Sequence, residues 1–251
     1  MATLDCGTYE STINSICHVY GIERSTAEQF LSGIDLDAAY ESNAIYSDCD
    51  DYLRELFEVE FGQPKLQLND VIWFHLTRTA RSSNFSEGIL PLGQVLDRVW
   101  KMLNSLLETP EQKANLATMQ ENGVKDYQFG LKTKNKIHHG PYAMLVREAA
   151  FNSDKICNHD YLEVPEIIED ICNGYRKQFG RCIYDTVTSK LEKCIVKFKS
   201  NKYTGLHLLA PALLYCWCIV RNEEFSSFAN TCFDSEGAPI SRGQIISVEF
   251  L

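Results

Sequence analysis

The sequence predicts an α+β fold in which helices surround a small sheet. Several segments carry apolar residues at helical spacing, a few short segments alternate apolar and polar residues, and helices separate these strands along the chain. Of the 251 residues, 45% are hydrophobic and 23% are charged. A chain of this length and composition can bury a core, so disorder is not expected.

The first part of the chain is predicted to be helical and acidic. We expect residues 1–68 to form a helical N-terminal segment, followed by an α+β domain at residues 69–251. A capping-box pattern at residues 25–28 would start a short helix that Gly33 can end. Apolar residues at helical spacing predict another helix at residues 50–61.

The remaining elements are predicted from the same two periodicities, 3.6 residues for helices and two for strands. Residues 124–140 are polar and basic, so we expect a long connection there. In chain order the expected elements are a strand at 71–77, helices at 93–107 and 110–122, a short strand at 141–146, a helix at 165–175, a strand at 193–199, a buried helix at 206–220 and a last strand at 246–250.

Charge and cysteine content indicate a cytoplasmic protein. The net charge of −10 disfavours non-specific binding to nucleic acid. The ten cysteines include no C-x-x-C pair and several lie in apolar runs, which is typical of buried, reduced thiols. No signal-peptide pattern follows Met1, and the apolar stretch at 206–220 is too short to cross a bilayer. Cys157 and His159 lack a second pair at ligand spacing, so no metal is expected.

The strand at 71–77 carries the candidate site. His75 and Thr77 are two residues apart, so their side chains share one face of the strand. If that face lines a cleft, the imidazole and the hydroxyl project together; if it is packed core, His75 is a structural histidine that needs a partner for each ring nitrogen. Arg78 and Arg81 follow, and either can hold an anionic group near the strand end.

These residues resemble a known family. Residues 74–78, Phe-His-Leu-Thr-Arg, precede a loop and then residues 85–90, Phe-Ser-Glu-Gly-Ile-Leu. This order resembles the first signature of ADP-ribosyltransferase-like folds. Residues 140–145, Gly-Pro-Tyr-Ala-Met-Leu, resemble the second, a strand carrying a tyrosine. The third is a glutamate on or beside a late strand, for which Glu249 is the candidate. The resemblance implies a small split antiparallel sheet of ADP-ribosyltransferase type within residues 69–251.

The same resemblance implies how NAD would be bound. It places His75 and Thr77 on the adenosine-side ribose. It leaves Arg78 or Arg81 to offset the charge of the pyrophosphate. Tyr142 would stack on nicotinamide. Together with Glu249, which would steady the cationic ribose, His75 and Tyr142 form the implied catalytic set.

The carboxylate departs from the family pattern. In the family it lies near the start of the last strand, where this chain has Gln244, whereas Glu249 lies near the end of that strand. Glu148 and Glu236 are the other possible acids. The alternative interpretation makes Tyr142 a core aromatic residue and Glu249 a solvated carboxylate at a sheet edge.

The function implied by the resemblance is NAD-dependent transfer of ADP-ribose to a macromolecule of unknown identity. The nicotinamide N-glycosidic bond would break through a cationic sugar, which a fixed carboxylate stabilises. Many small bacterial members of this class act as toxins. The alternative is a catalytically inactive module that binds NAD or another nucleotide, or that works through a protein partner.

Overall fold

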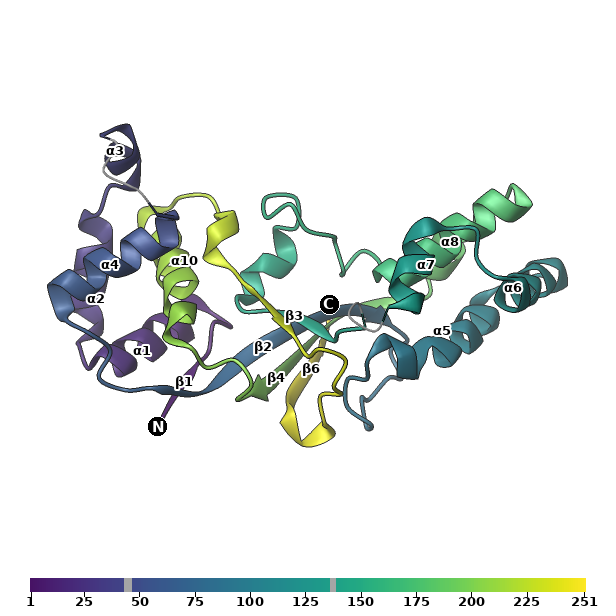
Figure 1. Cartoon of the computed structure of the whole chain (residues 1–251), viewed down its shortest axis with the longest axis horizontal. Helices are drawn as coiled ribbons and strands as arrows, with labels where there is room; N and C mark the ends of the chain where they lie inside the picture. The colour runs from purple at the N-terminus through teal and green to yellow at the C-terminus, as the bar shows by residue number, and fades with distance from the viewer. Residues whose placement is uncertain (43–46, 136–138) are drawn as a thin grey trace. The chain divides into compact units, whose positions relative to one another are not determined.

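The computed structural model describes residues 1–42, 47–135 and 139–251, and Figure 1 traces the chain. Helices and a sheet together confirm the α+β class. In chain order the elements are β1 (Ala2–Leu4), α1 (Tyr9–Tyr20), α2 (Arg24–Gly33), α3 (Leu36–Glu41), α4 (Cys49–Phe61), β2 (Leu68–Thr79), α5 (Leu92–Leu106), α6 (Pro110–Asn122), α7 (Tyr127–Lys134), β3 (Tyr142–Met144), α8 (Glu166–Phe179), α9 (Tyr184–Thr188), β4 (Glu192–Ser200), α10 (Leu209–Arg221), β5 (Cys232–Asp234) and β6 (Ile245–Phe250).

Helix α6 begins and ends at the residues that the sequence predicts. Thr109 is its N-cap: the hydroxyl accepts from the amide of Gln112 at 3.1 Å, and the Gln112 side chain accepts from the amide of Thr109 at 3.1 Å. Pro110 takes the first helical position, where its missing N–H costs nothing. Gly123 ends the helix.

The capping box predicted at residues 25–28 is wrong. Helix α2 starts two residues earlier than this box implies, at Arg24, and its N-cap Glu23 makes no side-chain bond to the helix. Glu28 instead pairs with Arg24 at 2.7 Å and accepts from the Tyr9 hydroxyl at 2.8 Å. The carboxylate that the pattern assigned to a cap therefore joins α2 to α1.

The long connection predicted at 124–140 is also wrong within its described part, because it contains α7. Asp126 caps this helix, accepting from the amides of Gln128 and Phe129. Helix α7 buries no residue, so it has no apolar stripe for the sequence to reveal. Lys132 holds it in place through a 2.8 Å ion pair with Asp170 of α8.

The described strands form a six-stranded sheet with the order β5-β3-β2-β4-β6, and β1 also pairs with β2. The β1–β2 pair is parallel, whereas β2 and β3 are antiparallel and align Phe74 with Met144. Strand β2 runs beyond the predicted 71–77 at both ends, and residues 71–74 are buried on both of its faces.

The chain divides into two compact units that are discontinuous in sequence. The first comprises Met1–Phe74, Ala143–Asn158 and Phe198–Phe233, and the second comprises the remaining segments His75–Tyr142, His159–Lys197 and Asp234–Leu251.

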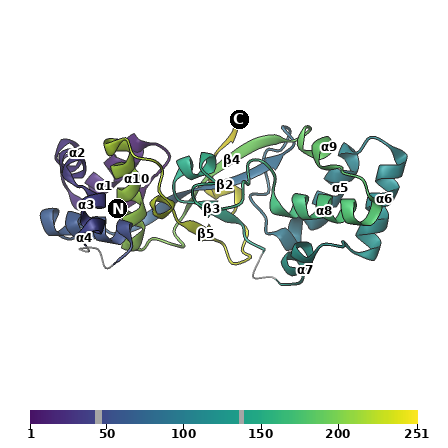
Figure 2. The same ribbon diagram turned by 90° about the horizontal axis from the view of Figure 1, so that it is seen from above.

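The first unit is built around α10. Residues Leu209–Cys218 of this helix are buried, and α1, α2 and α4 pack against it, as both views show (Figures 1 and 2). The indole N–H of Trp217 donates to the carbonyl of Ile34 at 3.1 Å, which fixes α10 to the end of α2. The boundary predicted between residues 68 and 69 stays a prediction, but helices before it and a helix far beyond it share this core.

The second unit has its own core among α5, α6, α8 and α9. Trp100 and Leu103 of α5 meet Ile171 and Tyr175 of α8 there, which confirms the two clearest amphipathic helices of the sequence. None of the helices that the structure describes combines the length and apolar character needed to cross a membrane.

Candidate functional site

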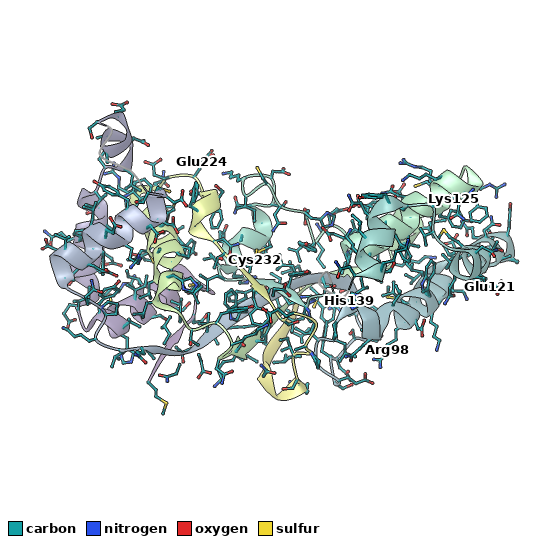
Figure 3. The ribbon with its side chains drawn as sticks, in the orientation of Figure 1. Arg98, Glu121, Lys125, His139, Glu224 and Cys232 are labelled. Atoms are coloured by element: carbon teal, nitrogen blue, oxygen red, sulfur yellow. The ribbon has the colours of Figure 1, made fainter. Side chains whose placement is uncertain are left out.

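The candidate site lies in the second unit, where three connections meet beside β2 and β3. The Leu92 amide donates to the carbonyl of His139 at 2.9 Å, and the Gly237 amide donates to the carbonyl of Gly140 at 3.0 Å. Figure 3 labels His139 at this junction, next to the start of β3. These bonds hold the segment before β3 between the start of α5 and the turn after β5.

Gly88, the glycine of the family-like turn, has a structural reason to be there. Ile89 and Ile240 exchange two backbone hydrogen bonds of 2.9 Å, so two loops run side by side at this point. Gly88 has φ +87°, and a Cβ on it would lie 2.0 Å from the carbonyl oxygen of Ile240. Only glycine fits such a backbone approach.

Strand register decides which side chains share a face. Because Phe74 is opposite Met144 in an antiparallel pair, Leu76 is opposite Tyr142 and His75 is opposite Ala143. Side chains alternate along each strand, so Tyr142 projects with Leu76, and His75 projects from the other face.

Contacts with β5 support this assignment. The Leu145 amide donates to the carbonyl of Thr231, and the Ser235 amide donates to the carbonyl of Pro141. These two bonds set an antiparallel register between β3 and β5 in which Asp234 is opposite Tyr142. On the Tyr142 face, Cys232 Sγ then lies 3.6 Å from Met144 Sδ. On the His75 face, the rings of Trp73 and Phe233 are 5.3 Å apart. Both contacts agree with the register.

His75 and Thr77 therefore lie on one face of β2, and both are half-buried. The ring of Tyr142 lies on the opposite face, together with Arg78. The structure thus brings the first two predicted residues together but does not bring the Tyr142 ring to them. What Tyr142 contributes beside His75 is its backbone carbonyl.

The imidazole of His75 has a defined orientation. Nδ1 lies 2.7 Å from the carbonyl oxygen of Tyr142, which can only accept, so Nδ1 carries the proton. Burial lowers the pKa of His75, and the bond to Tyr142 opposes this only in part. The ring is neutral at pH 7, so Nε2 presents a lone pair. The His75 side chain is half-buried.

The two arginines differ in how far they are engaged. Arg78 Nε donates to the carbonyl of Leu191 at 2.9 Å, and Nη1 donates to the carbonyl of Glu163 at 2.7 Å. Its side chain is 14% exposed. Arg81 is 76% exposed and pairs with Glu192 at 3.0 Å. Arg78 therefore joins β2 to two other segments, whereas Arg81 is the arginine accessible to a ligand.

Tyr142 lies beside two carboxylates that sequence analysis did not select. Its side chain is 36% exposed. Burial, followed by the charges of Asp234 and Glu166, raises the pKa of its phenol. Asp234 is its cross-strand neighbour, and Glu166 begins α8. No local pattern marks either residue, because the pairing of β3 with β5 joins segments that are far apart in sequence.

Glu249 lies away from this pair. It is exposed on β6, which is three strands from β3 in the sheet order, or about 14 Å at the usual strand spacing. Its charge acts instead on Cys194 of β4. Burial is the main cause that raises the pKa of Cys194 to about 12, and the charge of Glu249 adds to it. Gln244 serves a turn, since its side-chain oxygen accepts from the amide of Ser241 at 3.0 Å.

Across residues 1–42, 47–135 and 139–251, no group of three or more His, Cys, Asp or Glu side chains is arranged to hold a metal ion.

Comparison of the chain with models of known protein families, with curated proteins and with solved structures found no match.

Proposed function

We propose that this chain binds NAD at an ADP-ribosyltransferase-like site on the His75 face of β2. The observation that carries the proposal is the orientation of one imidazole. Because Nδ1 donates to the carbonyl of Tyr142, the neutral ring of the half-buried His75 has Nε2 as its acceptor atom. A ribose hydroxyl is a donor that fits it. Thr77, on the same face, supplies a hydroxyl that can donate or accept beside it.

The other contacts of the proposed complex follow from what is accessible. Arg81 is the exposed cation near the end of β2, so it is the arginine that we assign to the pyrophosphate. Arg78 acts indirectly, by fixing β2 to the segments of Leu191 and Glu163. Tyr142 positions His75 through its carbonyl.

The proposed activity is cleavage of the nicotinamide–ribose bond and transfer of ADP-ribose to a macromolecule, the chemistry by which toxins of this class act. It requires a carboxylate near the ribose that becomes cationic. Glu249 lies two strand spacings from β2, about 10 Å, so NAD would extend across β4 to reach it. The enzymatic form of the proposal therefore places the adenosine half at His75 and the nicotinamide half towards β6.

A second candidate is NAD binding without chemistry. One observation favours it: Gln244 occupies the usual position of the family carboxylate, and its side chain accepts a hydrogen bond within a turn. Glu249, the first candidate for the acid, is three strands from the tyrosine that would stack on nicotinamide.

The test combines two measurements on the same protein. Release of nicotinamide from labelled NAD reports cleavage, and a rise in Tm with NAD concentration reports binding. His75→Ala removes the acceptor, so we expect NAD affinity to fall about tenfold, a loss typical of one buried hydrogen bond. His18→Ala, an exposed histidine of α1 in the first unit, is the matched control and should change neither measurement.

The outcomes separate the candidates. Release that disappears in His75→Ala supports the transferase. Stabilisation by NAD without release, lost in His75→Ala, supports the binding module. If NAD neither stabilises the protein nor is cleaved, the proposal is rejected.

A further inference from the structure

Strand β6 forms one end of the sheet. The strand order β5-β3-β2-β4-β6 gives it β4 as its single neighbour among the described strands. The amide of Leu251 donates to the carbonyl of Lys193 at 3.0 Å. Because Leu251 follows β6 and Lys193 is near the start of β4, the two strands can lie side by side only if they are antiparallel.

The same bond shows which backbone groups of β6 face outwards. Amide and carbonyl directions alternate along a strand, so Glu249 and Ser247 direct theirs at β4, as Leu251 does. The residues between and before them, Ile246, Val248 and Phe250, direct theirs away from β4. In the part of the chain that the structure describes, no hydrogen bond joins these outward amides to another segment. A row of backbone donors and acceptors is therefore open along β6.

This edge lacks the protection that sheet edges usually carry. Its sequence, Ile-Ile-Ser-Val-Glu-Phe, contains no lysine and no proline, and Glu249 is its single charged residue. The side chain of Ile246 is 53% exposed. Strand β5, at the other end of the strand order, has only three residues, one of which is Asp234. A short strand with an acidic residue offers little to a pairing partner, so docking by strand pairing is expected at β6 and not at β5.

We propose that β6 pairs with β6 of a second copy of this chain, antiparallel, about a two-fold axis at Val248. In that register Val248 meets Val248 of the second copy, and Ile246 meets Phe250 of the second copy. Every outward amide and carbonyl of both strands then has a partner. The side chains also match, because an apolar row meets its own copy on one face and Glu249 lies opposite the hydroxyl of Ser247 on the other. This pairing does not depend on NAD binding.

Other two-fold registers leave the strands less well matched. An axis at Ser247 would bring Phe250 opposite Gln244, which lies before the strand. An axis at Glu249 would place two like carboxylates opposite each other. Only the axis at Val248 uses the whole open row and avoids this repulsion. Such self-complementarity is the property of an isologous interface, which is why the partner is a second copy and not an unrelated peptide.

Sedimentation equilibrium of the full chain over a concentration series measures the association, and we expect a reversible monomer–dimer equilibrium. Val248→Lys puts two ammonium groups together at the axis, so the dissociation constant should rise about tenfold or more. Val248→Glu should act likewise, whereas an equimolar mixture of the two variants should associate again, because the axis then joins opposite charges. Val59→Lys is the matched control: it changes a valine of α4 that is 85% exposed, so it should leave the dissociation constant unchanged.

A second pair of variants keeps the test independent of folding, because the side chain of Ser247 is exposed. In the proposed register it lies opposite Glu249 of the second copy. Ser247→Lys should therefore lower the dissociation constant several-fold, and Ser247→Glu should raise it. The contact occurs twice by symmetry, so both effects are doubled in free energy, and both should shrink at high salt.

Four results would overturn the proposal. A chain that sediments as a monomer at every concentration has no such interface. A dimer that persists in Val248→Lys, in protein that circular dichroism shows to be folded, joins through another surface. Failure of the Val248→Lys and Val248→Glu mixture to associate would remove the axis from Val248. If Ser247→Lys and Ser247→Glu shift the dissociation constant in the same direction, the register is wrong, and these two variants decide alone where the Val248 variants do not fold.

Discussion

A single backbone carbonyl determines what His75 can do. The bond from Nδ1 to Tyr142 fixes the tautomer, and burial keeps the ring neutral. Alternation along β2 is local, so the sequence alone predicts that His75 and Thr77 share a face. The face of Tyr142 depends on the register of β3 against β2, and a shift of one residue would reverse it. This is why the sequence could not place the tyrosine ring.

The lowered pKa of His75 predicts a pH dependence. The unfolded chain binds a proton near the ordinary value of 6.5, whereas folded His75 binds it only at lower pH. Unfolding free energy should therefore fall as the pH drops from 6.5 through the folded pKa, and NAD affinity should fall in that lower range because Nε2 becomes protonated. Urea titrations between pH 7.5 and 5 measure the first effect. His75→Gln should flatten the profile relative to His18→Gln; an unchanged slope would contradict the assignment.

Gly88 should not tolerate a side chain. Gly88→Ala combines a positive φ with a clash against Ile240, so we expect a loss of about 2 kcal/mol or more in unfolding free energy. Gly130→Ala is the control, because this glycine is inside α7 with open space around its Cβ position. That change should stabilise the protein by roughly 0.5–1 kcal/mol. Chemical denaturation of both variants decides, and equal effects would show that backbone strain at Gly88 is absent.

At the scale of elements, apolar periodicity predicted helices such as α5 and α8, which bury a stripe, and missed α7, which does not. Helices α5 and α8 each place a row of residues in the core of the second unit. Helix α7 packs Phe129 against Trp100 and is otherwise joined to α8 by ion pairs of Lys132, which leave no periodic signal. Strand β1 has three residues, too few to show alternation.

The ion pairs that fix α7 predict a strong effect of one substitution. Lys132 is 17% exposed and meets Asp170, which is 7% exposed, at 2.8 Å, and Glu166 at 3.4 Å. Lys132→Met would leave the Asp170 carboxylate buried and unpaired, so we expect a loss of about 3 kcal/mol at pH 7. Urea unfolding gives the value. Adding Asp170→Asn should recover most of it, and additive losses in the double variant would contradict the coupling.

The same network has a pH signature. Burial already raises the pKa of Asp170 from its ordinary 3.8, against the opposing effect of Lys132. Removing Lys132 raises it further. The folded variant then keeps a proton on Asp170 at pH values where the unfolded chain has lost it. Its unfolding free energy should therefore decrease as the pH rises from about 3.8 through the folded pKa. If the unfolding free energies of Lys132→Met and the unmodified protein change with pH in parallel over this range, the effect is ruled out.

Across the whole molecule, the cysteines follow the prediction of free, mostly buried thiols. None of the ten is in a disulfide, and seven are buried. Burial raises the pKa of Cys6 and Cys216 well above the ordinary thiol range. Exposed thiols are Cys157, Cys182 and Cys232, the last of which is labelled on β5 in Figure 3.

This distribution predicts the result of titration with a thiol-reactive dye. The folded protein should react at three cysteines and the denatured protein at ten. Burial raises the pKa of Cys232, so this residue should react more slowly than the other two. Mass spectrometry of the labelled peptides identifies the sites. Rapid labelling of Cys194 or Cys216 in the folded protein would contradict the burial described above.

The position of α10 at the centre of the first unit affects how the protein emerges from the ribosome. Helices α1, α2 and α4 are translated first, yet the helix that they enclose follows roughly 150 residues later, on the order of 10–30 s at usual elongation rates. During that interval apolar side chains such as Leu31, Leu53 and Phe57 have no α10 to cover them. Nascent chains arrested before residue 209 should therefore be bound by chaperones and cut readily by protease, and the full chain released from the ribosome should not.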